Sequence, residues 1–150
     1  MNMMFSATFP PYHPRTGQET DFVAKILRGE KRHTVRKNIA HWIDYDDKRV
    51  MLCTWAGKPY RRGSRPVPFA TAVLRVKMID RFWGHGNFRR IAVLGKICEE
   101  TAYYNIDNFA HEDGLSVDDF TAWFHYDLHG IICHACIWLD DVQPFKESAK

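Results

Sequence analysis

Apolar residues recur at helical spacing in the segment that precedes Gly29. Upstream of them, the tetrapeptide Thr16-Gly17-Gln18-Glu19 has the pattern of a helix capping box, with Thr16 as the N-cap. Gly29 stands where a helix commonly ends. The pattern therefore predicts a short helix between Thr16 and Gly29. Its apolar stripe would consist of Phe22, Val23, Ile26 and Leu27.

A second helical pattern begins at Ser116. This serine has the properties of an N-cap, and Asp118 and Asp119 place carboxylates in the first turn, where they favour a helix N-terminus. The pattern predicts a helix from Ser116 to a stop at Gly130. Its apolar stripe would consist of Phe120, Trp123, Phe124 and Leu128.

Several other stretches are rich in β-branched and aromatic residues and predict strands. They cover residues 3–9, 49–55, 69–79, 88–94 and 131–139. Several strands with only two helices predict an α+β fold in which the sheet curls or closes into a barrel. The length of 150 residues predicts a single domain, 1–150, large enough to bury its own core.

The composition is that of a globular protein, with 45% hydrophobic and 26% charged residues. No apolar run approaches the roughly 20 residues that a membrane helix needs. The first ten residues lack the basic start and the long apolar core of a secretory signal. These features predict a soluble, cytoplasmic protein with no membrane partner.

Charge is distributed unevenly along the chain, although the net charge is only +3. Twelve Lys or Arg lie between Lys25 and Arg65, whereas the segment from Glu99 to Asp141 has ten acidic residues and no Lys or Arg. Such polarity favours a negatively charged partner, for example a phosphate backbone. Pairing of the two halves with each other on folding explains the same pattern equally well.

The most informative motif is the octapeptide over residues 29–36, Gly-Glu-Lys-Arg-His-Thr-Val-Arg, where a helix stops and the chain turns into a strand. Downstream follow the long strand over 69–79, an acidic-Gly-apolar turn over 112–116 and the aromatic helix. In this order, over about residues 20–139, the features resemble the ASCH family. The resemblance implies a small PUA-like β-barrel with a few short flanking helices and a cleft for RNA or a modified nucleoside.

The resemblance also implies which residues act. The small acetylcytidine amidohydrolases of the family use a Lys, a Thr and an acidic residue, which correspond here to Lys31, Thr34 and Asp113. Those enzymes carry Glu at the acidic position, so Asp113 is one methylene shorter. The adjacent Glu112 would substitute for it if the turn is shifted.

The chemistry of these residue types sets conditions on the geometry. A Thr hydroxyl becomes a nucleophile only when a base removes its proton, and a Lys serves as that base only if its pKa is lowered. Residues three apart on a strand point to opposite faces, so we expect Lys31 in the turn and Thr34 on the strand. Arg36 would share the face of Thr34 and bind a substrate oxygen. Asp113 would pass a proton to the leaving amine.

The basic stretch over residues 58–65 offers a second candidate site. Tyr60 would stack on a base while Arg61 and Arg62 follow a phosphate backbone, although a solvated hairpin tip has the same composition. This stretch keeps two alternatives open beside the hydrolase. One is a non-catalytic RNA-binding module, and the other is a metal-independent ribonuclease.

The sequence predicts no metal site and no cofactor. Cys133 and Cys136, with His125 and His129 upstream, form a single Cys pair, whereas a Cys-rich structural zinc site has two. On a strand, Cys133 and Cys136 would also point to opposite faces. Buried cysteines in a core strand are the simpler interpretation.

Overall fold

The computed structural model describes residues 1–57, 61–83, 90–94, 102–124 and 134–146. The protein is a mixed α+β fold with a curled sheet and a few short helices. The strands are β1 (Asn2–Met4), β2 (His33–Arg36), β3 (Arg49–Ala56), β4 (Arg65–Trp83), β5 (Arg90–Leu94), β6 (Ala102–Asn105) and β7 (Ala135–Pro144). The helices are α1 (Phe22–Leu27), α2 (Ile39–Trp42), η1 (Ile43–Tyr45), α3 (Ile106–Glu112) and α4 (Val117–Trp123).

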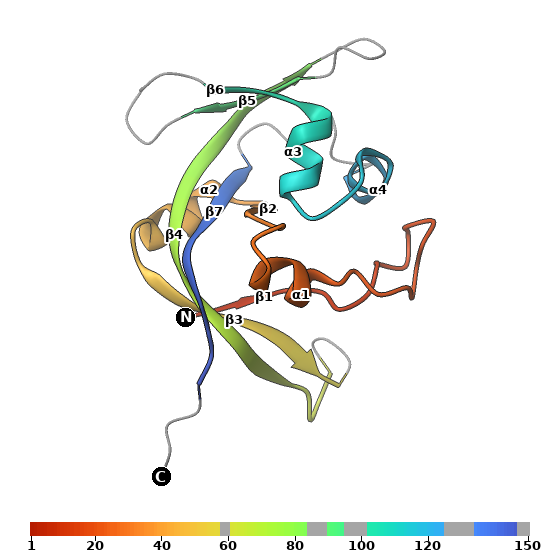
Figure 1. Ribbon diagram of the computed structural model, residues 1–150, viewed down its shortest axis with the longest axis vertical. Helices are drawn as coiled ribbons and strands as arrows, with labels where there is room; N and C mark the ends of the chain where they lie inside the picture. Colours follow the sequence, from red (N-terminus) through yellow and green to blue (C-terminus); the bar gives the residue numbers. More distant parts are fainter. Residues whose placement is uncertain (58–60, 84–89, 95–101, 125–133, 147–150) are drawn as a thin grey trace.

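The 19-residue strand β4 organises the sheet. It pairs antiparallel with β3, β7 and β5 in turn, and β1 adds to β3 in parallel, while β2 pairs with the other edge of β7. The pairing register shifts between Ile79 and Arg81 and between Thr71 and Val73, where β-bulges increase bending. As a result β4 arcs around a concave side on which β2, α1, α3 and α4 lie (Figure 1).

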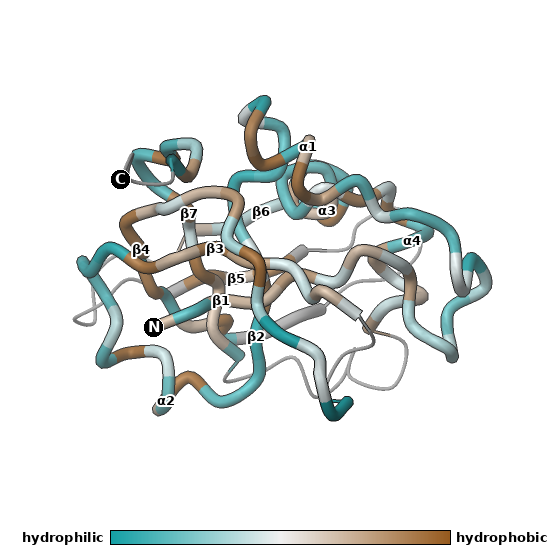
Figure 2. Tube along the Cα trace, turned by 90° about the horizontal axis from the view of Figure 1, so that it is seen from below, coloured by the Kyte–Doolittle hydropathy of each residue, from teal (hydrophilic) through white to brown (hydrophobic). Residues whose placement is uncertain are grey.

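The core lies on this concave side. Along β4 the side chains of Ala70, Ala72, Leu74 and Val76 are buried at alternate positions, which is the period of a strand with one face inward. Apolar positions recur along β3 and β4 in Figure 2, whereas the outer loops are mostly hydrophilic. No helix among the described residues is long and apolar enough to cross a bilayer.

The predicted capping box is wrong, because α1 begins at Phe22 and its N-cap is Asp21. Gly17 has a φ of +80°, which the first turn of a helix does not allow. The backbone there forms a loop instead, in which the N–H groups of Phe9 and Gly17 donate to the carbonyls of Gln18 and Phe9. The predicted first strand is also too long, since β1 ends at Met4.

The second predicted helix begins as expected. The Ser116 side chain accepts a hydrogen bond from the Asp119 N–H at 3.1 Å, and Asp118 and Asp119 lie in the first turn of α4. The helix ends at Trp123, earlier than Gly130. The remainder of the predicted helix and the start of the predicted last strand, residues 125–133, lie outside the described residues.

Candidate functional site

The turn between α1 and β2 directs Lys31 into the protein. Gly29 has a φ of +78°, and the N–H groups of Glu30 and Lys31 both donate to the Lys25 carbonyl, which ends the helix. Lys31 therefore lies in the turn and Thr34 on β2. This is the arrangement that the spacing of the motif requires.

The Lys31 side chain is 2% exposed and its Nζ has three acceptors. It donates to the His33 carbonyl at 3.0 Å, to the Asp113 carbonyl at 2.5 Å and to Asp113 Oδ1 at 3.2 Å. Nζ also lies 4.5 Å from the centre of the Phe22 ring. Burial lowers the pKa of Lys31, the Asp113 carboxylate opposes this shift, and Arg36 and Lys25 add to it.

Asp113 is presented by the turn that ends α3. Its N–H donates to the Phe109 and Ala110 carbonyls, and the following Gly114 takes a φ of +82°. Two further bonds hold this turn against the turn that carries Lys31. The Arg32 N–H donates to the Glu112 carbonyl at 2.7 Å, and Lys25 Nζ donates to the Gly114 carbonyl at 2.8 Å.

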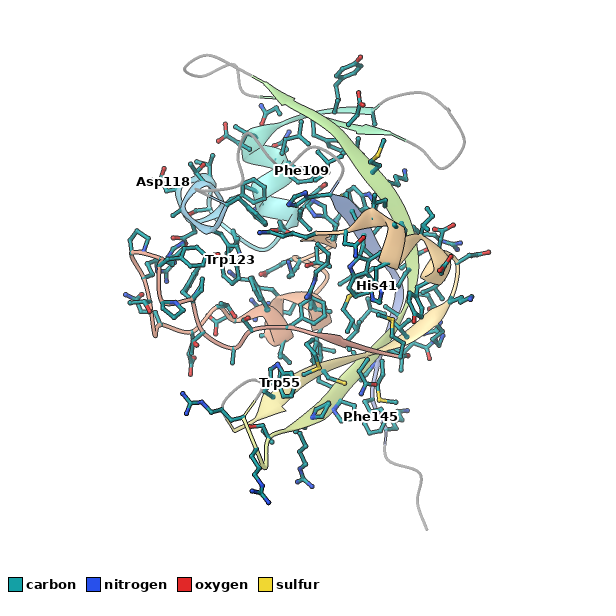
Figure 3. The ribbon with its side chains drawn as sticks, turned by 180° about the vertical axis from the view of Figure 1, so that it is seen from behind. His41, Trp55, Phe109, Asp118, Trp123 and Phe145 are labelled. Atoms are coloured by element: carbon teal, nitrogen blue, oxygen red, sulfur yellow. The ribbon has the colours of Figure 1, made fainter. Side chains whose placement is uncertain are left out.

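A cavity of about 100 Å³ brings the four residues of the motif-based prediction together. Its lining includes the polar side chains of Lys31, Thr34, Arg36 and Asp113. Its other lining residues are mostly apolar or aromatic: Met4, Phe5, Ser6, Phe22, Val35, Leu115, Trp123 and Phe124. Figure 3 shows Trp123 between α4 and the segment that follows β1, consistent with its ring contact to Phe9 at 5.7 Å.

The cavity combines a potential nucleophile with groups of both charges. Arg36 is fixed there by a bond from Nη2 to the Met4 carbonyl at 2.5 Å, and its guanidinium lies 5.1 Å from the centre of the Phe5 ring. For comparison, a dry cavity of about 150 Å³ holds a benzene molecule. This cavity is smaller, so it has room for a small acyl group or for the edge of one aromatic ring, next to the side chains of Phe5, Phe22, Trp123 and Phe124.

His33 does not line the cavity but lies next to Asp113, and nothing in the sequence singled it out. Its side chain is fully buried, with Nδ1 3.3 Å from Asp113 Oδ1 and Nε2 4.0 Å from Glu112 Oε2. The ring packs against Phe109 and Trp138, at 4.3 and 4.7 Å between ring centres. A histidine between the Lys and the Thr of the motif was visible in the sequence. Its proximity to Glu112 and Asp113, about 80 positions further along the chain, was not visible there.

The described residues of the basic stretch, 61–65, do not line this cavity. Arg61 and Arg62 lie exposed in the connection between β3 and β4, and they are absent from the cavity lining. Tyr60 lies outside the described residues. So do Cys133, His125 and His129, while Cys136 is buried on β7 and burial raises the pKa of its thiol. Among the described residues, no three His, Cys, Asp or Glu are grouped to hold a metal ion.

The two oppositely charged halves of the chain pair in part. Ion pairs join Lys31 to Asp113 and Arg49 to Asp141 across these two segments, while Arg15 and Arg75, from outside the basic segment, pair with Asp119 and Asp140. Within the described part of the chain, the exposed Arg61, Arg62 and Arg65 have no such pair. Pairing of the two segments therefore accounts for Lys31 and Arg49 but not for the hairpin arginines.

Comparison of the chain with models of protein families, with curated proteins and with solved structures finds no match.

Proposed function

We propose that the protein is a PUA-like, ASCH-type amidohydrolase that removes an acyl group from the exocyclic amine of a cytosine nucleoside. The observation that carries the proposal is the single small cavity shared by Lys31, Thr34, Arg36 and Asp113. The resemblance in the motif assigns roles to these residues. The curled sheet with short helices is compatible with the barrel that the resemblance implies.

In the proposed reaction, Thr34 Oγ1 attacks the acyl carbonyl carbon while its proton passes to neutral Lys31. The C–N bond then breaks, and the amine leaves with a proton delivered through Asp113. Water releases the acyl group from Thr34 in a second step, which regenerates the hydroxyl and yields a carboxylic acid. The lowered pKa of Lys31 supports its role as the base. The Arg36 guanidinium supplies positive charge for the developing oxyanion.

Incubation of acetylcytidine with the purified protein, followed by chromatography, tests the proposal. We expect the wild type to release cytidine, and Thr34→Val and Lys31→Met to lose at least about a hundredfold in rate, the usual range for loss of a nucleophile or base. Thr54→Val removes a hydroxyl on β3 outside the cavity lining and serves as the matched control. A folded wild type that releases no cytidine, or a Thr34→Val variant as active as Thr54→Val, would contradict the proposal.

The second candidate function is binding of single-stranded RNA, and it is favoured by the exposed hairpin arginines, which have no ion pair with any residue that the structure describes. Beside the hairpin, a groove of about 680 Å³ is lined by apolar and small polar residues, with two aromatic rings among them, Phe9 and Trp55. Arginines next to an aromatic groove are typical of surfaces that bind single strands. We expect RNA affinity to fall steeply between low and physiological salt. Arg61→Ala with Arg62→Ala should weaken binding, whereas Arg28→Ala, which removes an arginine paired with Glu30, should not.

A further inference from the structure

Trp123 borders the cavity but has no role in the proposed reaction. Among the described residues that line the cavity, it is the only aromatic one that is partly exposed. The other three aromatic lining residues, Phe5, Phe22 and Phe124, are buried in the core. Because Trp123 borders both the cavity and solvent, its ring forms part of the wall between them and limits the space beside the reacting groups.

Three rings hold the Trp123 side chain in place. The centre of its ring lies 5.7 Å from the ring centres of Phe9 and Phe22 and 6.2 Å from that of His13. Phe9 and His13 belong to the segment that follows β1, whereas Phe22 begins α1, so the indole is packed between two segments (Figure 3). Tilted and edge-to-face contacts of this kind add stability beyond the area that they bury, so they oppose movement of the ring.

The helix that carries Trp123 is attached to the same segment at both of its ends. At the last residue of α4, the Trp123 carbonyl accepts a hydrogen bond from the Tyr12 hydroxyl at 2.8 Å. In the first turn of α4, Asp119 forms an ion pair with Arg15 at 2.5 Å. Two polar contacts between the segment over residues 9–15 and α4 therefore fix the backbone position of Trp123.

The cavity encloses the acyl group of the proposed substrate and excludes the nucleoside. The acyl carbonyl carbon has to reach Thr34 Oγ1, so the acyl group must lie in the cavity that Thr34 lines. A cavity of about 150 Å³ holds the six carbons of benzene, so one of about 100 Å³ holds about four atoms of that size. An acetyl group has three non-hydrogen atoms and a propionyl group four, whereas a butyryl group has five.

We propose that Trp123 is a specificity-determining residue that limits the substrate to short acyl groups, of up to about three carbons. The effect on hydrolysis rests on the proposed function, whereas the limit on the size of a group that enters the cavity does not. Each further methylene would have to displace the indole or the rings packed against it. One methylene changes kcat/KM by about 10- to 200-fold in apolar pockets of other enzymes.

Hydrolysis of acetyl-, propionyl- and butyrylcytidine by the wild type and by Trp123→Ala tests the effect on the reaction. We expect the wild-type kcat/KM to fall about 10- to 200-fold from the propionyl to the butyryl substrate, and Trp123→Ala to lose most of this fall. Trp123→Phe, which keeps an aromatic ring at the position, should show part of the same change. Trp42→Ala removes a partly buried indole on α2, outside the cavity lining, and should keep the wild-type selectivity.

Added indole offers a further check on the same variant. A space left by removal of a buried ring can bind a free aromatic molecule. Indole should therefore restore selectivity against the butyryl substrate in Trp123→Ala and have no effect on the wild type. A Trp123→Ala variant that discriminates against the butyryl substrate as strongly as Trp42→Ala would overturn the proposal.

Binding of small amides gives a readout that does not depend on hydrolysis. Acetamide and butyramide are titrated separately into labelled protein while the backbone NMR signals of Thr34 and Val35 are followed. We expect the wild type to respond to acetamide alone and Trp123→Ala to respond to both. Equal responses of the wild type to the two amides, or no response to acetamide, would overturn the proposal. If the amides bind as expected but no acylcytidine is hydrolysed, the proposed function fails and the size limit set by Trp123 stands.

Discussion

Replacement of Gly114 by alanine should destabilise the protein more than the same replacement at Gly17. Both glycines have nearly the same positive φ, +82° and +80°, so the backbone cost of an L-residue is shared, at about 1–2 kcal/mol. Their surroundings differ. A Cβ on Gly114 would lie 3.1 Å from Cβ and Cδ of Lys31, whereas a Cβ on Gly17 would meet no atom within 4 Å.

The Lys31 chain has little freedom to yield to the added methyl group. Its Nζ is held by three acceptors and its methylenes are buried, so a shift of the stem breaks hydrogen bonds or displaces the Asp113 turn. Overpacking of this kind costs about 1–3 kcal/mol. We therefore expect Gly114→Ala to lose about 2–5 kcal/mol of unfolding free energy, against about 1–2 kcal/mol for Gly17→Ala.

Urea unfolding followed by tryptophan fluorescence measures both losses. The difference between the two variants isolates the contact with Lys31, since the backbone term cancels. Equal losses in the two variants would refute the reasoning. They would mean that the turn at Gly114 relaxes freely and that Lys31 is not held where the structure places it.

Three further predictions concern the same region. Burial lowers the pKa of Lys31 in the folded protein, so between that lowered pKa and the ordinary value of 10.5 the unfolded chain binds more protons than the folded one. Over this pH range the unfolding free energy of the wild type should therefore rise with pH relative to that of Lys31→Met. Urea titrations at several pH values measure this difference. Thr20→Val removes the buried donor to the Ser6 carbonyl at the edge of the cavity and should cost about 1–2 kcal/mol in chemical unfolding. Ser116→Ala removes the N-cap of α4 and should cost about 1 kcal/mol, whereas Ser116→Asp should retain most of it, with thermal melts as the measurement.

Much of the cavity was predictable because its key residues are close together in the sequence. A glycine that ends a helix places Lys31 in a turn, and strand alternation then puts Thr34 and Arg36 on one face, two residues apart. Asp113 was predicted only from the order of the motifs along the chain, because neither helix nor strand periodicity can place residue 113 next to residue 31. The structure places both in one cavity.

Where the sequence prediction failed, a tertiary contact overrode a local signal. Thr16-Gly17-Gln18-Glu19 reads as a capping box, but the cross-loop bonds between Phe9 and the 17–18 segment fix Gly17 at a positive φ and delay the helix to Phe22. Helix α3 was missed for the opposite reason. Its Asn105 N-cap has no capping-box partner, so the sequence lacks this signal for the start of the helix.

The His33 contacts could not be predicted, because they depend on how two distant turns meet. Strand alternation puts His33 on the face of β2 opposite Thr34, but it does not say which residues lie against that face. The end of α3 lies against that face, and the hydrogen bond from the Arg32 N–H to the Glu112 carbonyl holds it there. One backbone bond thus brings Glu112 and Asp113 to the two nitrogens of a single ring.

The same bond bears on the short carboxylate at position 113. Aspartate has a short side chain, so its carboxylate contacts Lys31 only if the backbone of the turn lies nearby; without that contact Lys31 would be buried without an acidic partner. In this structure the backbone of the turn lies close to the Lys31 segment. The Glu112 and Gly114 carbonyls accept bonds from Arg32 and Lys25, so the whole turn lies against the Lys31 segment and Asp113 reaches Nζ at 3.2 Å. Asp113 Oδ1 also lies 3.3 Å from His33 Nδ1, so one carboxylate oxygen faces the side chains of both Lys31 and His33.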